Sequence, residues 1–396
     1  MNAYFQNVKV LLDSLATSLG ASHADAITHS SGLFAPNVPS LIIPDVKPNA
    51  EDKKIAGRLL RAYRLSVADS QPEQSSRQDI WTKIRSHQPM FFEVLQQDDP
   101  AVLAAYLCNM SRHDATSGTV QGRQEYIKIR YNPLYRRFIS LYIKDKLVSL
   151  AEAVGAIACE NPEQGDWGKN LHIPTEQLIK AIEKKLAIDI TPPVVDGGLL
   201  KISGDSAQFH ERDLNAIYTA WNLANILKNT SGSVCEIGAG AGRVAYWAWR
   251  FGIRSYSIID LPHINVIQGF YLLKALPDVP IRLYGEPEQV TPKNHGITVA
   301  PTHDIQKFSP GRFDLVLNQD SFPEIHVDIV RDYLLRIHEI SKKYFLSINH
   351  ESRPSSIEGA MQLRVQDLID EVGAYQRLWR MPYWLRQGYV MELYSV

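Results

Sequence analysis

The sequence predicts an α/β fold in which a mainly helical first part precedes a parallel sheet that is covered by helices on both faces. Three observations lead to this prediction. Apolar residues recur at helical spacing up to about residue 190, and short apolar strands alternate with helices after about residue 205. Between these regions, Pro192-Pro193 and Gly197-Gly198 mark a connector, because neither pair extends a helix or strand. We therefore expect two domains, residues 1–195 and 196–396.

The helical elements of the first part are recognised by apolar residues three and four positions apart. Pro174-Thr175-Glu176 opens one further helix, which we expect to end near Ala187. Proline and serine clusters at residues 36–48, 70–76 and 161–167 separate the helices. The two clearest periodic runs are Val8, Leu11, Leu12, Leu15 and Leu19, and then Leu147, Leu150, Val154 and Ile157.

The second part alternates between the two kinds of element, which is typical of a parallel sheet with helical crossovers. The predicted strands are Val234–Ile237, Tyr256–Ile259, Ile297–Ala300, Phe313–Leu317 and Tyr344–Ile348. The predicted helices are Arg243–Phe251, Ile264–Leu276, Val327–Ser341 and Ile357–Val372. Two final strands, Tyr375–Met381 and Tyr389–Ser395, are joined by a short connection and predict an antiparallel pair at the C-terminal end.

Composition excludes several classes of protein. The 42 basic and 43 acidic residues give a net charge of −1, which argues against a protein that coats nucleic acid. The longest apolar run, Ala101–Cys108, is far shorter than the roughly 18–20 residues that span a bilayer. Cys108, Cys159 and Cys235 form no Cys-x-x-Cys pair, so neither a disulfide framework nor a zinc knuckle is predicted. The N-terminal sequence does not resemble a signal peptide, and we expect a cytoplasmic protein with no membrane partner.

A glycine-rich motif lies where the first predicted strand turns into a helix, the position at which open α/β sheets bind ligands. Gly238, Gly240 and Gly242 let the backbone approach a ligand closely. A dinucleotide fingerprint, Gly-x-Gly-x-x-Gly, would need glycine where this chain has Arg243. Glu236 stands two positions before the first glycine, where a carboxylate would oppose a pyrophosphate but suits a ligand that carries positive charge.

Two further acidic residues follow the next strands. Asp260 ends the second strand, 18 positions beyond Gly242, where a carboxylate can accept hydrogen bonds from both hydroxyls of an adenosine ribose. Asp304 follows the third strand and could accept from an adenine amino group. One polar group after each successive strand, together with the glycines, predicts a site for an adenosine-containing ligand.

These motifs resemble those of a known family. Glu236–Gly242 resembles motif I of class I S-adenosylmethionine-dependent methyltransferases, Asp260 matches their ribose-binding acid, and the closing strand pair matches their Rossmann-like sheet. The resemblance covers roughly residues 205–396. It implies S-adenosyl-L-methionine as cofactor and S-adenosyl-L-homocysteine as product. The cofactor-binding residues it implies are Glu236, Gly238, Ala239, Gly240, Gly242, Asp260, Leu261, Asp304, Ile305, Asn318 and Gln319.

Two short segments point to a narrower group. Ile259-Asp-Leu-Pro262 and Asn318-Gln-Asp-Ser-Phe-Pro-Glu-Ile325 are similar to segments of sugar O-methyltransferases from polysaccharide and glycosylated natural-product pathways. This resemblance implies a small-molecule, sugar-bearing acceptor. The alternatives are a phenolic or polyketide hydroxyl, an amine or RNA as acceptor, and a degenerate scaffold without activity. The neutral net charge disfavours RNA, and the complete set of cofactor residues disfavours a scaffold.

Candidates for a general base follow the fourth and fifth strands. A sugar hydroxyl is a poor nucleophile while it is protonated, so a histidine or carboxylate beside the cofactor would help. Our candidates are His326 or His350 as base, with Glu324 or Asp320 orienting it or acting alone. The structural alternatives are a solvated helix-start residue for His326 and a hydrogen-bonding strand end for His350. Because Pro323 interrupts any helix through the acidic residues, we expect no metal site.

A basic and tyrosine-rich segment, residues 121–146, lies in the helical part. Aromatic faces stack on sugars and arginine pairs with anions, so Tyr131 and Arg136 are candidate substrate-binding residues. The alternative is amphipathic helices with a basic exposed side. His210, just before the helix that leads into the first strand, is a third candidate, with an ordinary surface residue as its alternative. We expect the helical part to cap the sheet edge and shape the acceptor pocket, or to form a homodimer.

Overall fold

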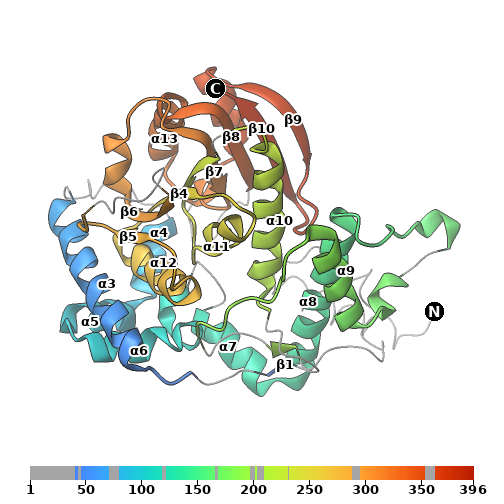
Figure 1. Ribbon diagram of the computed structural model, residues 1–396, viewed down its shortest axis with the longest axis horizontal. Coiled ribbons are helices and arrows are strands. Elements are labelled where there is room, and N and C mark those ends of the chain that lie inside the picture. The colour runs from blue at the N-terminus through green and yellow to red at the C-terminus, as the bar shows by residue number, and fades with distance from the viewer. Residues whose placement is uncertain are drawn as a thin grey trace.

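The computed structural model describes most of the chain as one arrangement of helices around a central sheet (Figure 1). The described residues are 41–42, 46–70, 80–117, 122–165, 168–196, 201–202, 209–230, 232–287, 295–352 and 362–396. The predicted periodic run at residues 8–19 lies outside them. None of the helices that the structure describes combines the length and the apolar character needed to cross a bilayer.

The central sheet has eight strands in the order β5-β6-β4-β3-β7-β8-β10-β9. Neighbours from β5 to β8 pair in parallel, whereas β10 pairs antiparallel with both β8 and β9. The predicted α/β class and its closing antiparallel pair are therefore confirmed. The strands are β3 (Ser233–Ile237), β4 (Ser255–Asp260), β5 (Ile281–Leu283), β6 (Gly296–Pro301), β7 (Phe313–Gln319), β8 (Ser341–His350), β9 (Gln376–Pro382) and β10 (Tyr389–Ser395).

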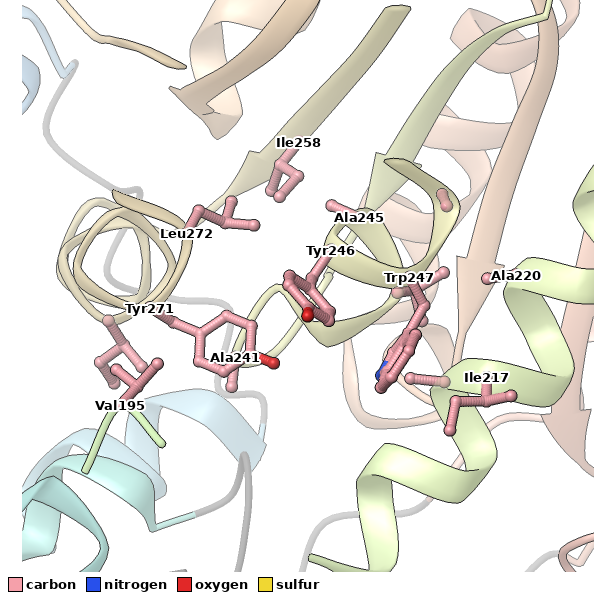
Figure 2. Close-up of a cluster of buried hydrophobic side chains, with 14 of the residues drawn as sticks. Val195, Ile217, Ala220, Ala241, Ala245, Tyr246, Trp247, Ile258, Tyr271 and Leu272 are labelled. Carbon is pink, nitrogen blue, oxygen red and sulfur yellow. The ribbon is translucent and has the colours of Figure 1, made fainter. Parts of the chain in front are cut away.

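Helices cover both faces of the sheet, as the alternation of apolar strand residues requires. In β3, Val234 packs in the cluster of α10 (Glu211–Ile226), α11 (Arg243–Arg250) and α12 (Pro262–Ala275). The adjacent Cys235 packs in a second cluster with α13 (Val327–Ile340) and α14 (Val365–Val372). Figure 2 shows the first cluster, in which Tyr246, Trp247 and Tyr271 fill the space between the helices.

The helices of the first part join the first of these clusters rather than forming a core of their own. Several begin at local signals, such as the capping box of Asn49 and Asp52 in α3 and Asn132-Pro133 in α8. In Figure 1, α3 lies along α12, and α8 lies near the lower end of α10. The helices are α3 (Ala50–Asp69), α4 (Ile80–Ser86), α5 (Pro89–Gln97), α6 (Pro100–Leu107), α7 (Gly122–Tyr131), α8 (Pro133–Ala153) and α9 (Thr175–Leu186).

The sequence-based elements agree with the structure except in a few places. The edge strand β5 was not predicted, because three residues are too short for a periodic signal. The predicted helix from Ile357 is wrong at residues 362–364, which precede the start of α14 at Val365; residues 353–361 lie outside the described part. A two-residue pair, β1 (Leu41–Ile42) with β2 (Lys201–Ile202), was also missed.

Close packing of α3 on α12 fixes the first part against the β5 side of the sheet. A Cβ atom on Gly269 of α12 would lie 2.5 Å from Cδ2 of Leu59 and 3.0 Å from Cδ2 of Leu283. Arg58 of α3 donates to Glu286 from Nε at 2.8 Å, and Lys274 of α12 pairs with Asp52 at 3.0 Å. The helical part is thus held by both apolar and charged contacts.

The close approach at Gly269 gives a stability prediction with an internal control. Gly269→Ala should lower the free energy of unfolding, because the added methyl group overlaps two buried leucines. Gly57→Ala, in the interior of α3, meets its nearest atom at 3.7 Å and should be neutral or stabilising by up to about 1 kcal/mol. Urea denaturation should separate the two variants by about 1–3 kcal/mol; equal stability would contradict the tight α3–α12 contact.

Candidate functional site

A cavity of about 400 Å³ lies at the carboxyl ends of β3, β4 and β7. Its volume lies within the range of small-molecule sites in proteins. It is lined by the glycine loop after β3, the ends of β4 and β6 and the loop after β7, together with α4, α10 and the turn between β9 and β10. The lining residues are Trp81, Arg85, Arg212, Asn215, Ala216, Glu236, Ile237, Gly238, Ala239, Gly240, Ala241, Arg243, Val244, Ile259, Asp260, Leu261, Thr302, Gln319, Asp320, Ser321, Glu324, Ile325, Ile329, Tyr333 and Arg386.

The glycine loop is packed directly against the loop after β7. Gly238 has φ +75°, and a Cβ atom on it would lie only 2.1 Å from Oγ of Ser321. The amide of Asn318 donates to the carbonyl of Ile237 at 3.0 Å and to Oγ of Ser321 at 2.6 Å. Glycine is therefore required at 238 both by the backbone conformation and by the neighbouring serine.

Two buried carboxyl groups line the cofactor side of the cavity. Glu236 accepts a hydrogen bond from the hydroxyl of Tyr256 at 2.8 Å, and burial raises the pKa of Glu236 to about 8. Asp260 accepts from the amide of Gln268 at 2.6 Å and from the backbone N–H of Leu261 at 2.8 Å, and burial raises its pKa to about 7. Gln268 also donates to the carbonyl of Gly240, so the acid and the glycine loop are held together.

This pair of carboxyl groups fits a ligand that supplies positive charge and hydrogen-bond donors. Among the residues that the structure describes, neither Glu236 nor Asp260 forms an ion pair. A carboxylate buried without a cation is costly, so burial shifts both groups toward their protonated forms. A sulfonium or ammonium group and ribose hydroxyls would stabilise their ionised forms.

A second pair of carboxyl groups lies across the cavity, and its two members differ in acidity. Asp320 has φ +65° and contacts Nη1 of Arg386, the hydroxyl of Tyr389 and, at 3.3 Å, Nη1 of Arg212. Burial alone would raise the pKa of Asp320, but the charges of Arg386 and Arg212 outweigh it and hold the pKa below its usual value. For Glu324, burial and then the charge of Asp320 raise the pKa to about 8.

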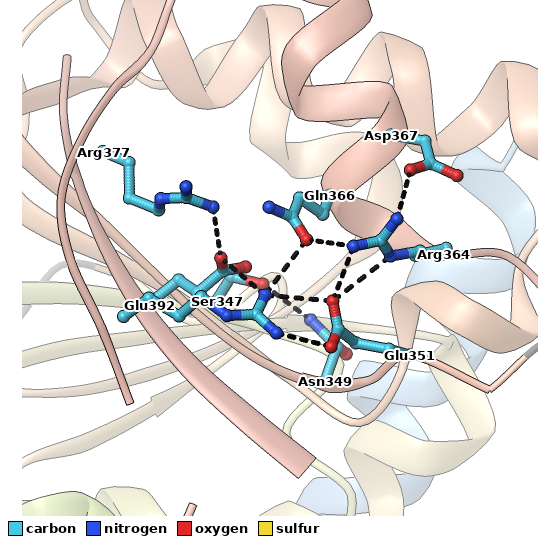
Figure 3. A network of polar contacts seen from close by, with 9 residues as sticks. Ser347, Asn349, Glu351, Arg364, Gln366, Asp367, Arg377 and Glu392 are labelled. Carbon is cyan, nitrogen blue, oxygen red and sulfur yellow. Dashed lines mark hydrogen bonds and ion pairs between the residues drawn. The ribbon is translucent and has the colours of Figure 1, made fainter. Parts of the chain in front are cut away.

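The end of β8 is fixed behind this pair by a polar network (Figure 3). Asn349 donates to Asn318 at 3.0 Å and accepts from the backbone N–H of Asp320 at 3.1 Å. Glu351 pairs with Arg364 at 2.9 Å and with Arg380, whose hydrogen bond contributes most to lowering the pKa of Glu351 to about 2. The network orients the loop after β7 and directs Glu351 toward α14 and β9.

The structure places nine of the predicted site residues on the wall of the cavity. Of the others, Asn318 is buried behind the loop, Gly242 is the N-cap of α11, and Ile305 packs in the second apolar cluster. Asp304 pairs with Lys307 at 2.6 Å and lies two residues after the cavity residue Thr302. The nine are Glu236, Gly238, Ala239, Gly240, Asp260, Leu261, Gln319, Asp320 and Glu324.

The histidine candidates lie outside the cavity wall and make structural contacts. His326 caps α13, with Nδ1 accepting from the backbone N–H of Asp328 at 3.3 Å. His350 packs edge-on against Tyr389 at 5.5 Å between ring centroids, and burial lowers its pKa. His210 is buried and caps α10, so the surface alternative for it was wrong.

The two remaining candidates also lie away from the cavity wall. Tyr131 is 71% exposed at the end of α7. Arg136 donates to the carbonyls of Ile129 and Arg130, which joins α8 to α7. Their substrate-binding role stays a prediction. Among the described residues, no group of three or more histidine, cysteine or acidic side chains is placed to hold a metal ion.

Several cavity residues were not found by sequence reasoning. Trp81 and Arg85 come from the short helix α4, and Arg386 comes from the turn after β9. None belongs to a motif, and each reaches the site only through the tertiary arrangement. Arg212 was the most accessible to inference, because it follows the predicted candidate His210 by two positions.

Comparisons with known proteins give only distant similarities. No protein-family model matches the chain, and no curated protein matches it either. Similar solved structures include a glycopeptide N-methyltransferase, MtfA, in complex with S-adenosyl-L-homocysteine (15% identity, TM-score 0.34, 46% of this chain and 90% of that chain). Others are a SAM-dependent methyltransferase from Aquifex aeolicus (15%, 0.30, 44% and 88%) and the [4+2]-cyclase SpnF (9%, 0.35, 49% and 84%). Similarity this low carries no argument about ligand or activity, which must come from the site residues.

The raised pKa of Glu236 gives a prediction about stability and pH. The folded, ligand-free protein keeps a proton on Glu236 that the unfolded chain releases near pH 4.5, so the free energy of unfolding should fall as pH rises from about 4.5 to about 8. In Glu236→Gln the contribution of this group to the loss should be absent, so the pH profile from urea denaturation should be flatter, while Asp260 and Glu324 still contribute to it. The exposed Glu93→Gln is the control. A Glu236→Gln profile as steep as that of the unmodified protein would contradict the assignment.

Proposed function

We propose that the protein is an S-adenosylmethionine-dependent O-methyltransferase that acts on a hydroxyl of a sugar or glycosylated metabolite. The observation that carries the proposal is that one cavity is shared by the two sets of groups that such a reaction needs. Glu236, the glycine loop and Asp260 lie on one side, and Glu324, with its raised pKa, lies on the other.

The residues on the cofactor side suit S-adenosylmethionine by their chemistry. Glu236 and the glycine loop would hold the amino-acid end, Asp260 the ribose hydroxyls, and the segment at Thr302 and Asp304 the adenine. When bound, the cofactor supplies an electrophilic methyl group. The chain itself binds and orients the two reactants, so that the acceptor oxygen faces that methyl group in the water-poor cavity.

Glu324 is the general base in this proposal. A general base must have a pKa high enough to take the proton of the acceptor hydroxyl as its oxygen attacks. A carboxylate with a pKa of about 8 is a stronger base than an ordinary carboxylate. Asp320 contributes by its negative charge and stays ionised itself because Arg386 and Arg212 hold it. Because of the same raised pKa, Glu324 is ionised in only a fraction of the molecules at neutral pH.

Other residues on the cavity wall support a sugar as acceptor. Trp81 of α4 offers an aromatic face of the kind that packs on sugar rings, and Arg212, Asn215 and Gln319 offer hydrogen-bonding groups for hydroxyls. Trp81 and Arg85 come from the helical first part, which supports residues 1–195 as a substrate cap above the methyltransferase domain at 196–396. The helices themselves exclude water from the reaction.

The proposal predicts a kinetic separation among the candidate bases. An acceptor is first identified by screening sugars and glycosides for the mass gain of one methyl group. With it, Glu324→Gln should lower kcat by about 100-fold or more without changing the affinity for S-adenosylhomocysteine. His326→Gln and His350→Gln are matched controls and should keep most of the rate. In the unmodified enzyme, kcat/KM should rise with pH through about 8 and level off above it. A Glu324→Gln variant at full rate would overturn the assignment of the base.

The cofactor side is tested separately by Asp260→Asn, which keeps the size of the side chain and removes its charge. Calorimetric titration should show about tenfold or greater loss of affinity for S-adenosylhomocysteine, because an amide cannot accept from both ribose hydroxyls as a carboxylate does. Asp304→Asn, at the cavity margin, should have a smaller effect. Unchanged affinity in Asp260→Asn would remove this residue from the cofactor site.

A further inference from the structure

We propose that Arg243 is a positioning residue, which holds the glycine loop in its ligand-binding conformation through a buried ion pair with Asp213. The inference rests on the proposed function, because S-adenosylmethionine is taken as the ligand of that loop. It also accounts for the residue that departs from the dinucleotide fingerprint, since a glycine at 243 would have no side chain to form the pair.

Arg243 is placed to anchor the loop because it directly follows Gly242 and is the first residue of α11. Its side chain is only 6% exposed, and Nε lies 3.3 Å from Oδ1 of Asp213 in α10. The guanidinium also lies over the ring of Tyr271 of α12, 5.2 Å from its centroid. From the start of α11, one side chain therefore contacts both neighbouring helices.

Asp213 divides its two oxygens between this pair and the start of its own helix. Oδ2 accepts from the backbone N–H of His210 at 2.8 Å, and Nδ1 of His210 accepts from the backbone N–H of Arg212 at 3.1 Å. The neighbours Arg212, Asn215 and Ala216 line the acceptor side of the cavity. The ion pair thus links the glycine loop with the helix that forms the opposite wall.

The charge of Asp196 links the helical first part to this cluster. Asp196 is buried, and its charge acts on Arg243 in addition to that of Asp213. Asp196 accepts a hydrogen bond from Oγ of Ser111 at 3.0 Å, in the short 3-10 helix η2 (Met110–Arg112). The glycine loop and α10 therefore meet at one buried arginine, and a neighbouring carboxylate that is bonded to the helical first part adds to the charge around it.

The ion pair is coupled to the conformation of the glycine loop because a buried charged side chain that loses its partner must change its position. If Asp213 is neutralised, the guanidinium of Arg243 keeps its charge in an apolar surrounding and must move toward water or another acceptor. That movement carries the first turn of α11 and the glycine loop with it. A purely structural pair elsewhere in the core would lower stability but leave the loop in place.

The test compares two buried ion pairs by calorimetric titration with S-adenosylhomocysteine and by thermal unfolding. Asp213→Asn and Arg243→Gln should each weaken binding about tenfold. The double variant should lose no more affinity than either single variant, because all three variants remove the same ion pair. Arg243→Lys should recover part of the affinity. It also serves as the milder variant if Arg243→Gln does not fold.

The matched control is Asp52→Asn, which breaks the pair of Asp52 with Lys274, at 3.0 Å and with side chains 2% and 16% exposed. It should lower the melting temperature and change the affinity by less than about twofold. The proposal is overturned if Asp213→Asn and Arg243→Gln bind as tightly as the unmodified protein, or if Asp52→Asn weakens binding as much as they do. Absence of binding in the folded, unmodified protein would instead contradict the proposed function on which the inference rests.

Discussion

The site depends on the way three parallel strands are tied together where β3 ends. The backbone N–H of Gly238 donates to the carbonyl of Ile259 in β4 at 3.0 Å. Asn318 of β7 and Ser321 both donate to the carbonyl of Ile237, at 3.0 and 3.3 Å. These bonds bring the glycine loop, the acid at the end of β4 and the loop after β7 to one point, so the groups that these three segments carry line one cavity. Because Ser321 fills the space that a side chain at 238 would need, the arrangement is also sterically fixed.

Carboxyl groups at the same edge of the sheet have pKa values that are shifted in opposite directions. Asp320 and Glu351 are paired with arginines, and the pKa of each lies below its usual value. Glu236 and Asp260 are buried and Glu324 is half-buried, and desolvation raises the pKa of each toward or above neutrality. A ligand with positive charge would favour the ionised forms of Glu236 and Asp260. An acceptor hydroxyl would donate its proton to the ionised form of Glu324. The electrostatics of the ligand-free protein thus describe the ligands that the cavity suits.

Sequence patterns predicted the sheet well because each strand is short, apolar and followed by a polar residue or a turn. The residues at strand ends, such as Glu236 and Asp260, could be found because topology brings such ends together. Trp81, Arg85 and Arg386 could not, because they reach the cavity from elements that carry no motif and are distant in sequence. His326 and His350 show what sequence position leaves out: they follow the loops that line the cavity, but helix capping and ring packing hold them outside its wall, and their catalytic role stays a prediction.

The central claim, that the cavity between the glycine loop and Glu324 binds S-adenosylmethionine, is tested most directly by a crystal structure of the protein with S-adenosylhomocysteine. The ribose hydroxyls should lie on Asp260, and the sulfur should face the side of the cavity formed by Glu324 and Asp320. Density for the ligand at another position, or a cavity that stays empty at saturating ligand, would contradict it.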